Sequence, residues 1–243
     1  VTAEDAEFVG GIAGQNSGWL TGTLTNNGTV KGKANVGGLA GSNANPDLLK
    51  GTETNRLTVT NTGDIIATEG GAAGIFHTNT GDIQYADISN SGTINGLGNG
   101  TVKNTGGLFG ENSGNVIYSS LTNSGEVIGG ENTGGLIGKN TGKITGGRTT
   151  AGNGLSYYAY KIYNNGTVSG TTNVGGLIGY NADESGTAGG KRGSLYAAYN
   201  TGVVTATGNN AGGIAGTNAG DISSVFNTVM TAEGSGEIIS GMT

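Results

Sequence analysis

The chain offers few side chains that could perform acid–base or nucleophilic chemistry. It has one histidine, His77, and no cysteine among its 243 residues, which excludes a thiol nucleophile, a disulfide and a thiolate metal site. A Ser-His-Asp arrangement would depend on folded geometry around His77 rather than on sequence spacing. His77 stands where six equivalent segments carry glycine, so we interpret it as a substituted turn residue.

Carboxylates recur in the chain without the pairing that acid–base catalysis needs. Asp64, Asp82 and Asp221 each lie in a Gly-Asp-Ile sequence, and a glycosidase would need two carboxylates at a defined separation. Other segments carry Thr, Asn, Lys or Glu in the same slot, which is typical of a solvated turn position. Asp183 and Glu184 are an acidic pair in a long segment and allow a weak surface calcium site. We expect no catalytic residue, metal or cofactor.

Aromatic and basic residues gather in two long segments, 145–160 and 182–194. Such side chains bind sugars or protein epitopes, and the alternative is that the tyrosines pack the segments onto the body of the protein. We expect the two segments to lie against each other, with a third insertion at 44–56 on the same side. The candidate ligand-binding residues are Arg148, Tyr157, Tyr158, Tyr160, Tyr180, Lys191, Arg192 and Tyr196.

A seven-fold repeat dominates the rest of the chain. An asparagine follows a small-residue block each time: GGIAGQN, GGLAGSN, AGIFHTN, GGLFGEN, GGLIGKN, GGLIGYN and GGIAGTN. The block starts lie 27, 36, 33, 28, 41 and 37 residues apart, so the bare unit has about 27 residues. These asparagines are Asn16, Asn43, Asn79, Asn112, Asn140, Asn181 and Asn218.

A second asparagine recurs between successive blocks, in frames such as LTNNGTV and VTNTGDI. Asparagine and glycine tolerate positive φ and favour turns, and neither favours helix. The frame places an aliphatic residue on either side of each turn, which indicates short strands. This second set is Asn26, Asn61, Asn90, Asn123, Asn164 and Asn200, and a seventh frame at Asn227 lacks the glycine.

These periods predict an all-β, right-handed parallel β-helix of about seven coils, with roughly three strands in each coil. Equivalent asparagines would stack about 4.8 Å apart and form amide ladders. Three aliphatic columns, beginning at Ile12, Leu24 and Val30, would fill the core. A propeller is less compatible, because its blades need about 40 residues. We expect residues 1–243 to form one solenoid domain, either part of a longer protein or a subunit of a fibre.

Composition fits a narrow-cored, elongated protein. The chain has 53 glycines, one proline and 33% hydrophobic residues, which is little apolar material for a globular core of this length. Its net charge of −6, without a basic run, argues against nucleic acid as a partner. No segment is long and apolar enough to span a membrane, so we expect no direct membrane insertion.

The block resembles the GLUG-motif repeat of large bacterial surface and secreted proteins. The motif's Gly-Leu-any-Gly core matches Gly38 to Gly41, Gly107 to Gly110, Gly135 to Gly138 and Gly176 to Gly179. Two further blocks have Ile for Leu, and the third unit departs further, with His77 in place of the last glycine. Filamentous-haemagglutinin-like adhesins carry such repeats, so the resemblance implies a secreted or cell-surface bacterial location and a scaffold or adhesive role.

Four hypotheses for function follow. The first is a structural and adhesive segment that acts as a stalk and binds a host or bacterial surface glycan or protein. The second is a subunit of an extracellular filament that binds copies of itself end to end. The third is a β-helix enzyme that degrades polysaccharides. The fourth is an ice-binding solenoid, which would require a regular column of Thr-x-Thr that we do not find in the repeats.

Overall fold

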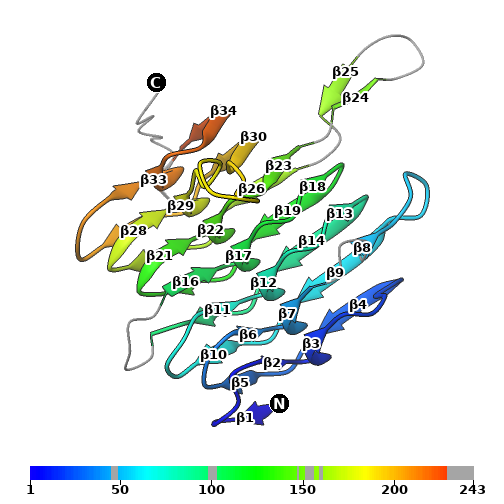
Figure 1. Ribbon diagram of the computed structural model, residues 1–243, viewed down its shortest axis with the longest axis vertical. Helices are drawn as coiled ribbons and strands as arrows, with labels where there is room; N and C mark the ends of the chain where they lie inside the picture. The colour runs from blue at the N-terminus through cyan, green and yellow to red at the C-terminus, as the bar shows by residue number, and fades with distance from the viewer. Residues whose placement is uncertain (45–48, 98–102, 147, 151–155, 159–160, 229–243) are drawn as a thin grey trace, which may run out of the picture.

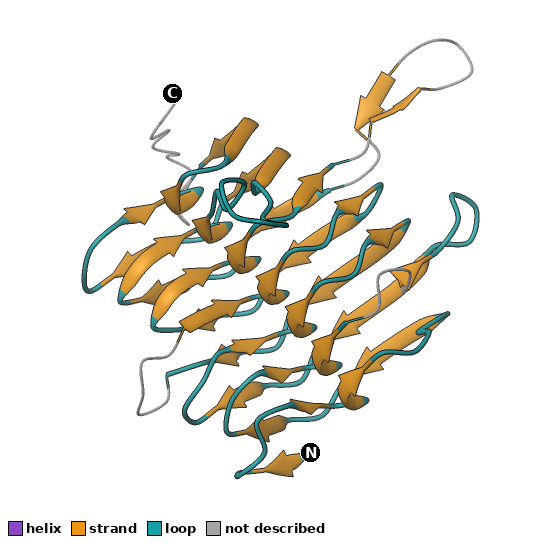
Figure 2. Ribbon diagram, in the orientation of Figure 1, coloured by secondary structure: helices purple, strands orange, loops and turns teal. Residues whose placement is uncertain are grey.

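The structure, a computed structural model, describes residues 1–44, 49–97, 103–146, 148–150, 156–158 and 161–228. Every element in these residues is a β-strand, and the strands stack in successive coils from the N-terminus to the C-terminus (Figures 1 and 2). All strand pairings between coils in the described residues are parallel, as in the pairing of Thr25 with Thr60 and of Asn79 with Asn112. The prediction of a parallel β-helix with about seven coils is confirmed.

Three of the sheets have one strand from each of seven coils. Sheet A contains β1 (Thr2–Ala3), β5 (Val30–Gly32), β10 (Ile65–Ala67), β15 (Ile94–Asn95), β20 (Val127–Ile128), β27 (Val168–Gly170) and β31 (Val204–Ala206). Sheet B contains β2 (Val9–Gly10), β6 (Val36–Gly37), β11 (Ala72–Ala73), β16 (Lys103–Gly106), β21 (Glu131–Gly134), β28 (Thr172–Gly175) and β32 (Ala211–Gly212). Sheet C contains β3 (Ala13–Asn16), β7 (Ala40–Asn43), β12 (Phe76–Asn79), β17 (Phe109–Asn112), β22 (Ile137–Asn140), β29 (Ile178–Asn181) and β33 (Ala215–Asn218).

Sheet D is wider, because most coils contribute two short strands to it. Its first row contains β8 (Leu49–Lys50), β13 (Ile83–Gln84), β18 (Val116–Ile117) and β23 (Lys143–Thr145). Its second row contains β4 (Thr23–Asn26), β9 (Leu57–Asn61), β14 (Ala86–Asn90), β19 (Ser120–Asn123) and β26 (Ile162–Asn164). Two unbroken strands, β30 (Ser194–Asn200) and β34 (Asp221–Asn227), continue both rows. The expectation of roughly three strands in each coil was too low.

In coils 3 and 4 a kink divides sheet D into its two rows, and in coils 2 and 5 the two rows are separated by the residues between Lys50 and Leu57 and between Thr145 and Ile162. Tyr85 and Tyr118 have left-handed φ values of 52° each between their two strands, a conformation that breaks a regular strand. Ala197 and Ser224 take the same conformation at 58° and 55° within the unbroken strands. The four residues are two tyrosines, an alanine and a serine, so no single residue type marks the kink in the sequence.

The core consists of aliphatic columns, as expected. The column that begins at Val30 is buried through the interior coils, at Ile65, Ile94, Val127 and Val168. The column that begins at Ile12 is less buried at its two ends. Ile12 in the first coil is 48% exposed, and Ile214 in the last coil is half-buried. A further column was not expected, and it fills the first row of sheet D with Leu49, Ile83, Val116, Ile144 and Leu195.

Both predicted asparagine ladders are present. Each amide nitrogen Nδ2 donates to Oδ1 of the equivalent asparagine in the next coil, at 2.6 to 3.0 Å, from Asn16 to Asn218 and from Asn26 to Asn227. Most Nδ2 atoms also donate to the carbonyl of the glycine two residues later, as Asn112 does to Gly114 at 2.9 Å. The interior amides are buried, so these bonds satisfy polar groups that water cannot reach.

A third ladder was not predicted. Asn132 donates to Asn104, Asn173 to Asn132 and Asn210 to Asn173, at 2.8 to 2.9 Å. All four asparagines have positive φ, between 54° and 65°, at or just before the beginning of their sheet B strands. Asparagine tolerates this left-handed conformation better than other residues with a side chain.

Candidate functional site

The insertion in unit 6 forms a loop, residues 182–193, that ion pairs hold over sheet C. Within the loop, Arg192 Nη1 contacts Asp183 Oδ2 at 2.9 Å. Glu184 Oε1 lies 2.7 Å from Lys139 Nζ of β22, and Arg192 Nη2 lies 3.0 Å from Asp221 Oδ1 of β34. The pairs are partly exposed, so they fix the position of the loop and add little to global stability.

The same loop reaches a coil further back along the solenoid. Lys191 Nζ donates to the carbonyl oxygen of Ser113, two coils before the loop, at 2.8 Å. The loop also changes the first ladder, because Asn181 has no turn glycine and donates instead to the Gly193 carbonyl at 3.2 Å. The loop therefore spans coils 4 to 6 on the outside of the solenoid.

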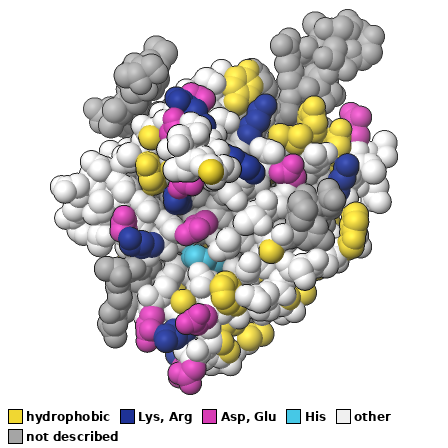
Figure 3. Space-filling model, in the orientation of Figure 1, with side chains coloured by type: hydrophobic (Ala, Val, Ile, Leu, Met, Phe, Trp, Pro, Cys, Tyr) yellow, Lys and Arg dark blue, Asp and Glu magenta, His cyan; other side chains and the backbone are white. Residues whose placement is uncertain are grey.

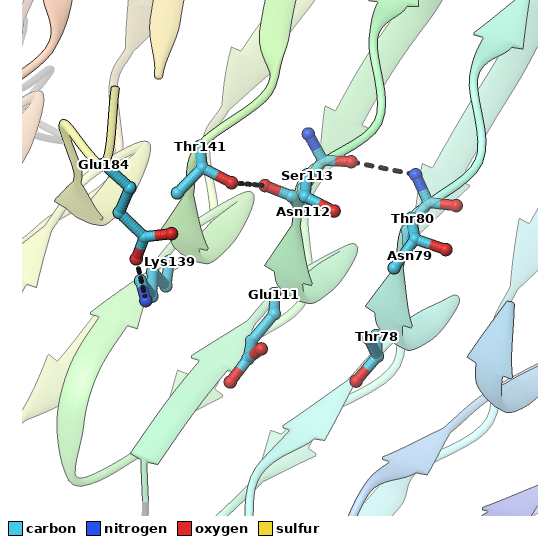
Figure 4. Close-up of a pocket in the computed structure, with 9 residues that line it drawn as sticks. All are labelled: Thr78, Asn79, Thr80, Glu111, Asn112, Ser113, Lys139, Thr141 and Glu184. Atoms are coloured by element: carbon cyan, nitrogen blue, oxygen red, sulfur yellow. Dashed lines mark hydrogen bonds and ion pairs between the residues drawn. The ribbon is translucent and has the colours of Figure 1, made fainter. Parts of the chain in front are cut away.

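A polar hollow of about 140 Å³ lies between this loop and the ends of the sheet C strands (Figure 4). Hydroxyl groups line it from Thr78, Ser113 and Thr141, and charged groups from Glu111, Lys139 and Glu184. In Figure 4, Glu184 and Lys139 face each other on one side, with Glu111 between that pair and Thr78. The hydrogen bond that Lys139 donates to Glu184, together with the charge of that carboxylate, raises the pKa of Lys139 against the effect of burial. The hollow can hydrogen-bond a small hydroxylated or charged ligand.

The space-filling view shows the same face, on which charged side chains of both signs are interspersed (Figure 3). No single sign of charge covers it. This mixture is unlike the basic stripe that binds a nucleic acid backbone.

Four of the predicted ligand-binding residues lie near or beside the loop. Lys191 and Arg192 are exposed within it, and both make the contacts given above. Tyr180 is half-buried on sheet C and pairs in register with Lys139. Tyr196 is half-buried on sheet D, where it pairs with Thr145.

The other predicted residues belong to a different part of the molecule. Arg148, Tyr157 and Tyr158 lie in a hairpin of β24 (Arg148–Thr150) and β25 (Ser156–Tyr158), with Arg148 paired to Tyr158. Tyr160 falls outside the described residues. The prediction that the two segments lie against each other was wrong, because the hairpin leaves between the two rows of sheet D and the loop leaves between sheets C and D. Figure 1 shows the hairpin projecting beyond the sheet, well away from the loop.

Sequence reasoning missed the aromatic side chains on sheet D. The Tyr163 and Tyr199 rings stack with centroids 5.1 Å apart, and the Tyr199 and Phe226 rings at 5.2 Å. A hollow of about 250 Å³ adjoins them, lined by Lys161, Ala197, Tyr199, Ser224 and Phe226 among others. The signal was visible in the second asparagine frames, where the residue before the asparagine is Tyr, Tyr and Phe in the last three units.

Sheet D also corrects the earlier search for threonine columns. Thr23 and Thr25 pair in register with Thr58 and Thr60, so a Thr-x-Thr column does exist in the first two coils. It continues as Asp87 and Ser89, then as Ser120 and Thr122. The change of residue type from unit to unit concealed it in the sequence.

His77 is a structural residue in this fold. It is 4% exposed, and its Nε2 would lie 2.3 Å from a Cβ placed on Gly71. Gly71 occupies the corner position that the third ladder fills with asparagine in neighbouring coils, so the imidazole occupies space that this glycine leaves. Burial lowers the pKa of His77 to about 4, against the opposing effect of the Glu111 carboxylate. Among the described residues, Nε2 has no hydrogen-bond partner.

The acidic residues considered earlier make local contacts. Asp64 Oδ1 accepts from the Thr93 amide at 3.1 Å, and Asp82 Oδ1 accepts from the Asn115 amide at 2.7 Å. Asp183 is bonded by Ser185, which lowers its pKa, and by Arg192. Within the described part of the chain, no group of three or more histidine, aspartate or glutamate residues is placed to hold a metal ion.

Comparisons with protein-family models, with curated proteins and with solved structures give no match. No helix in the described residues is long and apolar enough to cross a membrane.

Proposed function

We propose that this chain is an extracellular structural and adhesive segment of a bacterial surface protein, like the proteins that carry the GLUG-motif repeats that its blocks resemble. In this role the solenoid is a stalk, and the residues on its outside bind a glycan or a protein on a host or bacterial surface. The proposal assigns binding and mechanical roles to the chain and no catalytic step.

The observation that carries the proposal is the continuity of the two predicted amide ladders. They connect Asn16 to Asn218 and Asn26 to Asn227 without a gap. Beside them, the buried aliphatic columns are also continuous. A scaffold of this kind is stiff along its axis and tolerates insertions, because loops are free of the packing that holds each coil.

Two insertions on this scaffold support the adhesive part. The hairpin of β24 and β25 projects from sheet D, and the loop 182–193 borders the polar hollow of Figure 4. They occupy different corners of the solenoid, so each can act without the other.

The experiment is a binding assay on bacterial and host cells with the purified chain and three variants. One variant lacks residues 147–160, the second carries Lys191→Ala and Arg192→Ala, and Thr167→Ala, at an exposed turn, is the matched control. We expect wild-type binding that at least one of the first two variants loses and the control retains, with equal melting temperatures. A wild-type chain that binds no cell would refute the adhesive role, and binding that survives both changes would exclude the hairpin and the loop as its sites.

A second candidate function, a subunit of a self-assembling filament, is favoured by apolar side chains on the first coil. Ile12 is 48% exposed and Trp19 is 71% exposed there, and exposed apolar groups of this size can pack against another copy of the chain. A head-to-tail contact of this type propagates unless its rotation closes a ring. Light scattering that grows with concentration in the wild type, and returns to the monomer value in Ile12→Lys, would support it. A monomer at all concentrations would contradict it.

A further inference from the structure

One outward-facing column of sheet D runs through all seven coils. It occupies the position before each second-ladder asparagine and alternates with buried aliphatic residues such as Val59 and Leu121. In the first four coils its members carry hydroxyl groups: Thr25, Thr60, Ser89 and Thr122. In the last three coils its members are aromatic: Tyr163, Tyr199 and Phe226. We call this set the outer column.

The hydroxyl half forms a regular grid. Neighbouring strands lie about 4.8 Å apart, and alternate residues along a strand about 6.6 Å apart. A parallel column beside the outer column adds the hydroxyl groups of Thr23, Thr58 and Ser120. In coil 5 this second column continues as Lys161, outside the hydroxyl half. Within the hydroxyl half its one charged member, Asp87, is bound by the guanidinium of Arg56 through two contacts of 2.8 Å. The grid therefore offers uncharged hydrogen-bonding groups at repeating intervals.

The aromatic half continues this period with rings. Their centroid separations of 5.1 and 5.2 Å are close to the spacing between coils. Phe226 is 57% exposed, and the adjoining hollow of about 250 Å³ has the small residues Ala197 and Ser224 at its kink. In coils 3 and 4 the same kink carries Tyr85 and Tyr118, whose stacked rings are 5.2 Å apart. The small residues thus leave open a space that other coils fill with a ring.

We propose that the outer column binds a linear, uncharged polysaccharide laid along the solenoid axis. Such a polymer repeats its own hydroxyl groups and apolar ring faces, so it can meet hydroxyl groups in one half of the column and aromatic rings in the other. The column itself bears no charge, which disfavours nucleic acid and acidic polymers. A protein strand that binds by backbone pairing needs a free sheet edge, and the interior strands of sheet D are paired on both sides. This inference rests on the proposed adhesive function and names the class of its ligand.

The test uses two solid probes, microcrystalline cellulose and chitin, in a pull-down with the whole chain. The double variant Tyr163→Ser, Tyr199→Ser gives the aromatic half the residue type of coil 3, and Thr60→Glu places a charge in the hydroxyl half. Thr205→Glu, which adds the same charge at an exposed threonine of sheet A, is the matched control. We expect the wild type and the control to bind at least one probe, and each column variant to bind about tenfold more weakly at an unchanged melting temperature.

Three results would overturn the inference. They are a wild-type chain that binds neither probe, column variants that bind as well as the control, and adsorption to ice in the absence of polysaccharide binding. The cell-binding assay separates this inference from the proposed function. If cell binding depends on the hairpin or the loop while the column variants bind cells normally, the adhesive function stands and the outer column is not its site.

Discussion

The burial of His77 predicts a loss of stability as the pH falls. Burial lowers the pKa of His77 to about 4 from an ordinary value of 6.5, so the folded protein keeps the imidazole neutral where the unfolded chain takes up a proton. The contribution of this group is fully present above pH 6.5 and is lost progressively as the pH falls towards 4. The difference between the two pKa values corresponds to roughly 3 kcal/mol of unfolding free energy.

The first variant gives coil 3 the residue that its neighbours have at the position of His77. In coil 4 that position holds Gly110, so the variant is His77→Gly, which removes the titrating group. Gly71 is kept, because a Cβ there would also lie 2.5 Å from the Lys103 carbonyl oxygen. His77→Gln is a second variant that keeps a polar side chain of similar size and does not titrate.

Urea unfolding followed by circular dichroism at pH 7.5 and pH 4.5 measures the effect. Every carboxylate of the chain is present in all three proteins, so the comparison isolates the replacement of His77. We expect the wild type to lose about 2 to 3 kcal/mol more than either variant between these pH values. An equal pH dependence in all three proteins would show that His77 is not held neutral by burial.

Two further predictions concern the scaffold. Asn112→Leu should lower the unfolding free energy by about 1 to 3 kcal/mol, because it leaves Asn79 Nδ2 without its acceptor and removes the donor to Asn140. The control Thr167→Ala, at an exposed turn, should change the unfolding free energy little. Similar melting temperatures for the two variants would show that the ladder contributes nothing to stability. Gly63→Ala should cost about 1 to 3 kcal/mol, since the added Cβ would lie 2.1 Å from the Gly28 carbonyl oxygen, whereas Gly28→Ala meets nothing within 4 Å and should change stability by less than about 0.5 kcal/mol. Equal effects of the two glycine substitutions on the denaturant midpoint would contradict the close stacking of these turns.

Most of the fold could be predicted from the repeat, because the spacing of its asparagines is required by the hydrogen bonds between coils. Asn112 and Asn140 recur with the same neighbours, since each must place its amide in one ladder. The third ladder had a similar signal, an asparagine two residues before five of the six glycine pairs that open the blocks, as in Asn104 and Asn132. Side chains that face solvent lack this constraint. For that reason the residue types of the outer column vary between coils, and only the strand register aligns them.

The positions of the insertions could not be obtained from the sequence. The distance from Asn140 to Ile162, or from Asn181 to Ala198, gives the length of an insertion but not its place within that interval. In unit 5 the extra residues follow Ile144, and in unit 6 they precede Leu195, although these two residues are partners in one row of sheet D. A core aliphatic residue before an insertion and one after it have the same side-chain type, so the sequence does not show on which side of that residue the insertion lies.

The most direct test of the account is whether the chain holds a polysaccharide without cleaving it. The purified chain would be incubated with cellulose and chitin, and the bound protein and the reducing ends released into solution would be measured together. The account predicts saturable retention on at least one polymer, with no more reducing ends than a buffer control. Reducing ends that rise with protein concentration would identify an enzyme and contradict the structural and adhesive role.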